Sequence, residues 1–168
     1  GFGIESGSQR ILNIINKKLS LDQVRYAMKA AKEVGLETMG FFMIGNPGEN
    51  EETMEATIKF ALELDPDFAF FAMTTPFPGT KLYDLVLKKG RLLLNNWREF
   101  GTHYYKAAFE LEEVTENLVE KKCHEAYRRF YFRPKRVFKL LFQKDGWRNL
   151  PLRAHAAMNL IFAKREQQ

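Results

Sequence analysis

The sequence predicts an α/β fold in which parallel strands alternate with helices. Three observations support this prediction: three short apolar segments have strand character, a helical pattern of apolar residues follows each of them, and turns rich in glycine, proline or asparagine separate them. Strands joined through helices pair in parallel by right-handed crossovers. The pattern therefore fits a doubly wound sheet or part of a (β/α) barrel, and three strands are too few to close a barrel.

The first strand and helix lie at the start of the chain. Residues 2–5 (FGIE) alternate as a half-buried strand does, and Ser8 is placed to cap a helix over residues 9–15. Glu5 ends this strand, at the position where parallel α/β folds bind ligands. Two interpretations of Glu5 remain open: a ligand-binding carboxylate, or a structural one paired with an arginine such as Arg10.

The second strand and its flanking helices come next. Ser20 and Gln23 have the spacing of a capping box, and Gly35 ends the helix that they begin. Residues 38–45 form a continuous apolar run, which predicts a strand buried on both faces of a parallel sheet. Asn50 is then placed to cap a helix whose acidic first turn complements the helix dipole.

The third strand covers residues 68–73, and the segment TTPFPGT and a helix that ends at Gly90 follow it. Because the carboxyl ends of parallel strands meet at one edge, residues 5–8, 45–49 and 74–80 are expected to converge there. Two interpretations of Glu49 in these segments remain open: part of a ligand loop, or a carboxylate that serves only the dipole of the helix that follows it.

The composition is that of a globular protein. The chain has 168 residues, of which 45% are hydrophobic and 28% charged, so a core can form and disorder is not expected. No apolar run is long enough to span a bilayer, and a cytoplasmic location is expected. A single cysteine, Cys123, excludes an intrachain disulfide and cannot by itself hold zinc or an iron–sulfur cluster.

Charge divides the chain into two parts. Residues 1–89 carry 10 Lys and Arg against 12 Asp and Glu, whereas residues 90–168 carry 16 against 9. This change predicts two modules, residues 1–90 and a basic helical extension over residues 91–168. Within the extension, residues 111–143 have a helical pattern.

Residues 128–153 mix arginine and lysine with aromatic residues, and three interpretations remain open. The segment is a helix whose aromatic residues cap the fold, a helix that binds an anionic membrane surface, or a site for single-stranded nucleic acid. The nucleic-acid site is the least favoured, because Arg133 and Pro134 interrupt the run.

Taken in order, three segments resemble motifs of the radical S-adenosylmethionine superfamily, in the group that carries a cobalamin-binding domain. GIESGSQRIL resembles its fourth-strand motif, FFMIGNPGENEET its fifth-strand motif and TTPFPGTKLYD its sixth-strand motif. The resemblance covers residues 1–89 and extends more loosely to about residue 143. It implies that residues 1–90 are the C-terminal half of a partial (β/α) TIM-type barrel and that the chain is the C-terminal part of a larger enzyme.

The resemblance also implies a binding site for S-adenosylmethionine at the ends of the three strands. The residues implied in cofactor binding are Glu5, Ser6, Ser8, Ile44, Gly45, Thr74 and Thr75. Glu5 would bind the ribose hydroxyls with the two serines nearby, and Ile44 and Gly45 would lie against adenine. The two threonines would meet the cofactor or the substrate.

The other cofactors of the family have no ligands in this sequence. The CxxxCxxC motif that holds a four-iron four-sulfur (4Fe-4S) cluster and the DxHxxG motif that ligates cobalamin are both absent. An N-terminal portion is therefore expected to bind the cluster and the cobalamin. No metal site is expected in this chain, and the chain alone is expected to be inactive.

The implied function of the complete enzyme is to form a 5′-deoxyadenosyl radical for methyl transfer or oxidative cyclisation. A small molecule, lipid-like or tetrapyrrole, is the expected substrate, in the cytoplasm or at the membrane surface, and no nucleic-acid partner is expected. Two alternatives remain: a truncated, non-catalytic α/β module that binds a nucleotide or a partner protein, and a methylthiotransferase-like radical enzyme without cobalamin. The helical pattern of residues 111–143 argues against the second, which usually carries a small basic barrel for RNA.

Overall fold

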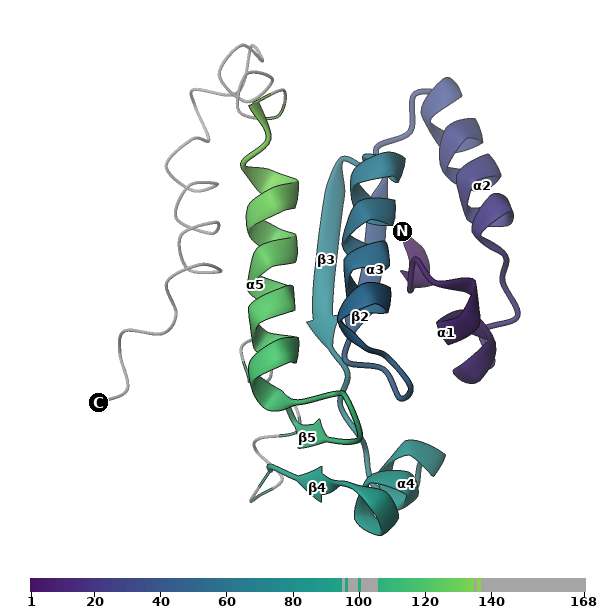
Figure 1. Ribbon diagram of the computed structural model, residues 1–168. Coiled ribbons are helices and arrows are strands. Elements are labelled where there is room, and N and C mark those ends of the chain that lie inside the picture. Colours follow the sequence, from purple (N-terminus) through teal and green to yellow (C-terminus); the bar gives the residue numbers. More distant parts are fainter. Residues whose placement is uncertain (95, 97–99, 101–105, 135, 137–168) are drawn as a thin grey trace.

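The structure is a computed structural model that describes residues 1–94, 96, 100, 106–134 and 136 (Figure 1). At its centre lies a three-stranded sheet in the order β1, β2, β3, with both pairs of neighbours parallel. The strands are β1 (Phe2–Glu5), β2 (Met39–Ile44) and β3 (Phe68–Met73). The predicted α/β class and its three parallel strands are confirmed, as in a partial TIM-type fold.

Helices alternate with these strands as the apolar periodicity predicts. They are α1 (Gln9–Ile14), α2 (Leu21–Glu33), α3 (Glu51–Leu64) and α4 (Lys81–Lys89). The Ser20 hydroxyl accepts from the amide of Gln23, whose side chain accepts in return from the Ser20 amide. Asn50 and Thr53 form the same reciprocal cap at the start of α3. Both predicted caps are confirmed, because capping is set by residues close in sequence.

The segment after α4 differs from its predicted helical pattern. It forms two short antiparallel strands and a helix, β4 (Arg91–Leu92), β5 (Phe109–Glu110) and α5 (Glu116–Tyr131). Leu111 and Val114 exchange two backbone hydrogen bonds across a tight turn, and α5 begins only after its cap, Thr115. The prediction that the helix includes Leu111 is therefore wrong. The three-residue spacing of Leu111 and Val114 suits the two ends of a turn as well as a helix.

Helices cover one face of the sheet. Figure 1 shows α3 in front of β2 and α5 beside β3, and the two helices contact each other. Ile4, Phe42 and Phe71 point toward this layer and pack in one core with apolar residues of α2, α3 and α5. Because α5 shares this core, the described part of residues 91–168 is packed against the sheet. The division into modules at residue 90 stays a prediction.

The opposite face of the sheet is open among the described residues. Met39, Phe41 and Phe68 point to it and are 37%, 40% and 37% exposed. Burial along β2 thus alternates from residue to residue. The prediction that residues 38–45 are buried on both faces is wrong for this structure, because no described element packs on the second face.

Two tyrosines of α5 close the outer edge of β3. The Tyr127 hydroxyl donates to the carbonyl of Phe71 and accepts from its amide, at 3.0 and 3.1 Å. Tyr131 makes the same pair of bonds to Ala69, at 2.8 and 3.2 Å. Ala69 and Phe71 are two residues apart on the strand, so their backbone groups point to the same edge. The two tyrosines are four residues apart on the helix, so their side chains point to the same side and reach that edge together. The hydroxyls satisfy backbone groups that a further strand would otherwise pair.

Arginines at the end of α5 bind acidic groups of the α/β layers. Arg129 lies 2.7 Å from Glu55, and Arg133 lies 2.6 Å from Asp65. Phe130 is buried beside them. For residues 128–134 and 136 this agrees with a helix that caps the fold, although these two arginines are paired rather than free in water. Residues 137–153 lie outside the described residues, so the membrane and nucleic-acid interpretations stay predictions.

Candidate cofactor-binding site

The carboxyl ends of all three strands lie at one edge of the sheet. β1 pairs in parallel with β2 up to Glu5, with one register shift, and β2 pairs in parallel with β3 up to Ile44 and Met73. In Figure 1 the arrow of β3 points from the sheet toward α4 and the β4–β5 pair, which lie beyond this edge. The segments that follow Glu5, Ile44 and Met73 therefore leave the sheet on the same side, as predicted.

Glu5 ends β1 in a strained conformation. Its φ of 68° lies in the left-handed region, which costs a non-glycine residue about 1–3 kcal/mol. The pairing of β1 with β2 shifts register just before it. Glu5 Oε1 lies 2.8 Å from Lys17 Nζ, and the two side chains are 21% and 33% exposed. The structural alternative for Glu5 named Arg10 as its partner; the structure gives Lys17 instead.

Gly3 leaves room for this ion pair. A Cβ atom at Gly3 would lie 3.2 Å from both Glu5 Oε1 and Lys17 Nζ, closer than most real Cβ contacts. The carboxylate and the ammonium thus pass close over the backbone of β1. Asn16 and Lys18, on either side of Lys17, have φ values of 54° and 49°. Asn16 takes this conformation in the turn that caps the C-terminus of α1, since the amides of Asn16 and Lys17 donate to the Asn13 and Leu12 carbonyls.

Ser6 and Ser8 support the turn after β1. Ser6 is fully buried, and its hydroxyl lies 3.1 Å from the Thr57 hydroxyl on α3. Ser8 has the extended backbone of an N-cap, but its side chain makes no capping bond, and its amide donates to the Ser6 hydroxyl. Gly7 sits so close to α3 that a Cβ there would lie 2.5 Å from the Ala56 carbonyl oxygen. The assignment of the two serines to the cofactor stays a prediction.

The end of β2 is also closely packed. Ile44 is fully buried in the core, and its carbonyl accepts from the Thr74 amide at 3.0 Å. Gly45 has a φ of 90°, and a Cβ there would lie 3.0 Å from a methyl group of Val119 on α5. A glycine is required at this position on both counts. Contact of Ile44 and Gly45 with adenine stays a prediction.

The end of β3 is tied to the end of β2 by a side-chain bond. Thr74 is buried, and its hydroxyl donates to the side-chain carbonyl of Asn46 at 3.2 Å. Asn46 is itself buried. Thr75 is partly exposed, and its hydroxyl lies 3.5 Å from the carbonyl of Met73. Of the two predicted threonines, Thr75 is the more accessible.

Glu49 has a role that its position in sequence did not indicate. It is 1% exposed, and its Oε2 accepts from the amides of Gly45 and Asn46, both at 2.7 Å. Its other oxygen, Oε1, is buried without a hydrogen-bond partner. Burial raises the pKa of Glu49 to about 7, against the two amide bonds and the charge of Arg10, which lower it. The interpretation in which Glu49 serves only the helix dipole is wrong, because its side chain bonds to the loop after β2.

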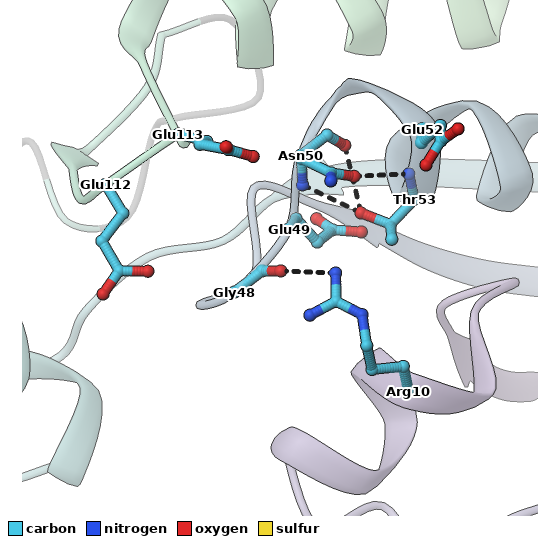
Figure 2. Close-up of a pocket in the computed structure, with 8 residues that line it drawn as sticks. All are labelled: Arg10, Gly48, Glu49, Asn50, Glu52, Thr53, Glu112 and Glu113. Atoms are coloured by element: carbon cyan, nitrogen blue, oxygen red, sulfur yellow. Dashed lines mark hydrogen bonds between the residues drawn. The ribbon is translucent and has the colours of Figure 1, made fainter.

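A cavity of about 590 Å³ lies beside this loop (Figure 2). Its lining residues are Arg10, Gly48, Glu49, Asn50, Glu52, Thr53, Glu112 and Glu113. Figure 2 shows Arg10 reaching from α1 to the Gly48 carbonyl, at 2.9 Å, with Glu112 on the other side. Four of the eight residues are glutamates, so the cavity has an acidic lining.

Comparison with known proteins identifies the family. A model of the radical SAM superfamily matches residues 1–61. An uncharacterized methyltransferase of Pyrococcus horikoshii is 42% identical over 146 residues, which cover 87% of this chain and 31% of that protein. The anaerobic magnesium-protoporphyrin IX monomethyl ester cyclase of Rubrivivax gelatinosus is 30% identical over 144 residues, 85% of this chain and 25% of that enzyme. The chain belongs to the radical SAM superfamily.

The tRNA-2-methylthio-N(6)-dimethylallyladenosine synthase of Zymomonas mobilis is also similar, with 34% identity over 84 residues, 49% of this chain and 19% of that enzyme. Relatives with three different named activities are thus similar to this chain. The chain spans less than a third of the length of each of these relatives.

The residues described here suit one radical SAM cofactor and not the other. The Glu5 carboxylate is accessible and has free acceptor capacity, as a vicinal diol requires, so S-adenosylmethionine fits this edge. A 4Fe-4S cluster does not fit: Cys123 is 1% exposed on α5, with its thiol against the Phe71 carbonyl, and burial raises its pKa to about 12. Within the described ranges, no group of three or more His, Cys, Asp or Glu side chains could hold a metal ion.

Among the same residues, no helix combines the length and the apolar character that crossing a bilayer requires.

Proposed function

We propose that this chain supplies the adenosine-binding edge of a radical SAM enzyme, one that uses cobalamin for methyl transfer or oxidative cyclisation on a small molecule. The first relatives reported above are named as a methyltransferase and a tetrapyrrole cyclase, which supports this choice of reaction. The cofactor supplies the radical chemistry, and the residues of this chain bind and orient its adenosine.

The observation that carries the proposal is the conformation of Glu5. A carboxylate that ends a parallel strand, keeps a left-handed backbone and remains partly exposed is poorly explained by stability alone. An exposed ion pair with Lys17 contributes only about 0–1 kcal/mol, which does not offset the strain. A diol that bridges both carboxylate oxygens gives this geometry a function, because a carboxylate accepts two hydrogen bonds at once.

The predicted site residues take different parts in this proposal. Glu5 binds the ribose hydroxyls, and Thr75 lies where the cofactor meets the substrate. Ser6, Ser8 and Thr74 shape the strand ends, and Ile44 and Gly45 bring the backbone of β2 close to adenine. The 4Fe-4S cluster and the cobalamin are assigned to polypeptide outside these residues, since this chain offers no ligands for them.

A methylthiotransferase acting on tRNA is the second candidate, because the Zymomonas mobilis relative carries that name. A putative methylthiotransferase of Methanocaldococcus jannaschii matches 89% of this chain, so coverage does not separate the two candidates. We rank the methylthiotransferase below the first candidate because that relative is 28% identical, against 42% for the methyltransferase. A lipid-like or tetrapyrrole substrate and contact with a membrane surface remain part of the first proposal only.

The test is the affinity of the complete enzyme for S-adenosylhomocysteine, measured by calorimetry. Glu5→Ala is expected to weaken binding about tenfold or more, since a hydrogen bond to a charged group contributes about 1.5–3 kcal/mol. Glu37→Ala is the matched control, because Glu37 is exposed and precedes β2 at the opposite edge of the sheet. Equal affinity of Glu5→Ala and Glu37→Ala would refute the ribose assignment.

A further inference from the structure

We propose that Glu49 is a positioning residue that sets the shape of the cofactor edge through the backbone of Gly45 and Asn46. The inference rests on the proposed function, because it assigns a role at the same site. Glu49 does not touch the cofactor in this account. It acts through the loop that leaves β2.

The hydrogen bonds of Glu49 fix two successive peptide groups. One oxygen, Oε2, accepts from the amides of Gly45 and Asn46, both at 2.7 Å. These are the first amides beyond the end of β2, and Gly45 has a φ of 90°. Short bonds from an ionised acceptor are about twice as strong as neutral ones. A single carboxylate therefore holds the chain in the bend with which it leaves the sheet.

The loop that Glu49 holds is also bonded to the end of the neighbouring strand, β3. Asn46, held by Glu49 through its backbone, accepts from the Thr74 hydroxyl through its side chain, at 3.2 Å. Glu49, Asn46 and Thr74 are 1%, 2% and 5% exposed, so water competes little for these bonds. The ends of β2 and β3 are in this way tied to one carboxylate. A change at Glu49 is expected to move both of them.

A purely structural role explains Glu49 poorly. The start of α3 already has a reciprocal cap, in which Asn50 accepts from the Thr53 amide, and the Glu49 side chain bonds to the loop after β2 rather than to this helix. Its Oε1 atom is buried with no hydrogen-bond partner, which makes the ionised form unfavourable. A buried charge that costs folding stability while it orders a loop beside a binding site is typical of functional residues.

The charges around Glu49 come from three elements. Arg10 on α1 lowers its pKa, but burial is the larger effect and the pKa is about 7. Glu52 on α3, and Glu112 and Glu113 before α5, line the same cavity, but they are not among the groups that shift this pKa. Protonation of Glu49 therefore falls near neutral pH. Below pH 7 the carboxyl becomes neutral and holds the two amides more weakly.

The test compares Glu49→Gln with the wild type in the complete enzyme, by calorimetric binding of S-adenosylhomocysteine between pH 6 and pH 8.5. The wild-type affinity is expected to fall several-fold from pH 8 to pH 6, with a midpoint near 7. Glu49→Gln is expected to bind about as weakly at pH 8 as the wild type does at pH 6, and to show no such midpoint. Glu52→Gln, at the exposed rim of the cavity, is the matched control and should keep the wild-type profile.

The outcomes separate this inference from the proposed function. If Glu5→Ala weakens binding and Glu49→Gln keeps the wild-type affinity and pH profile, the inference fails and the proposed function stands. If Glu5→Ala has no effect on binding, the proposed function fails, and the inference that rests on it fails with it. Should Glu49→Gln not fold, Thr74→Val breaks the outer link of the same network; a loss of affinity at pH 8 supports the inference, and unchanged affinity overturns it.

Discussion

One glutamate ends β1 and another lies in the loop after β2, and their surroundings differ in almost every respect. Glu5 is partly exposed, strained at its own backbone and paired with Lys17. Glu49 is buried, and it bonds to the backbone of other residues. The comparison teaches that an acidic residue near a strand end can serve a site in two ways, by meeting a ligand or by holding the loop that meets it.

The difference has an energetic counterpart. Glu5 places its strain in the backbone, where the ion pair with Lys17 offsets little of it. For Glu49, the unfavourable contribution to folding stability comes from the burial of its charge. Its pKa of about 7 lies above the ordinary value of 4.5, so the folded state binds a proton more tightly than the unfolded state. The stability of the fold therefore decreases as pH rises from about 4.5 to 7, and the full cost is present above pH 7.

The largest effect is expected for Glu49→Gln on stability. A neutral amide removes the buried charge, so the free energy of unfolding at pH 8 should rise by about 3 kcal/mol, and it should change little at pH 4.5. Urea unfolding of the complete protein at the two pH values measures this difference. A variant less stable than the wild type at pH 8 would show that the carboxylate contributes more to the fold than its burial costs.

Gly45→Ala tests the backbone that Glu49 holds. The alanine would keep a φ of 90° only with strain and would press on Val119 at 3.0 Å. A loss of about 2 kcal/mol of unfolding free energy is expected from the two effects together. The control is Gly35→Ala, where φ is 76° but no atom lies within 4 Å, so only the strain remains. Equal losses of unfolding free energy in Gly45→Ala and Gly35→Ala would show that the contact with Val119 on α5 does not contribute to the effect.

Lys17→Met has the smallest expected effect on stability. The ion pair with Glu5 is partly exposed, so unfolding free energy should fall by less than about 1 kcal/mol. Thermal unfolding at low and at high salt measures it, because screening weakens exposed pairs. A loss similar to that of Gly45→Ala would mean that Lys17 holds the strained end of β1 in place, and Glu5 would then resemble Glu49 more than we propose.

Local sequence predicted those parts of the fold that depend on nearby residues. The caps at Ser20 and Asn50, the strand over residues 68–73 and the end of α4 near Gly90 follow from contacts within a few positions. The partner of Glu5 could not be predicted, because Lys17 reaches it only through the left-handed loop at residues 16–18.

The roles of Glu49 and of the turn at residues 111–114 escaped prediction for a related reason. Glu49 sits directly before a helix, where a carboxylate is usually explained by the dipole, and its burial depends on tertiary packing. Leu111 and Val114 have a spacing that suits a helix and a turn alike, and the pairing of β4 with β5 favours the turn. The PGE sequence at residues 47–49 was the available signal, since a glutamate in this turn can reach back to the amides three and four positions before it, the first beyond the end of the strand.

The most direct test of the central claim uses a cofactor analogue without the diol. Binding of S-adenosylhomocysteine and of its 2′-deoxy analogue is measured in the complete enzyme, for the wild type and for Glu5→Ala. The account predicts that the wild type discriminates against the deoxy analogue about tenfold and that Glu5→Ala binds both compounds with equal, weak affinity. Undiminished discrimination by Glu5→Ala would show that another residue holds the ribose and would contradict the account.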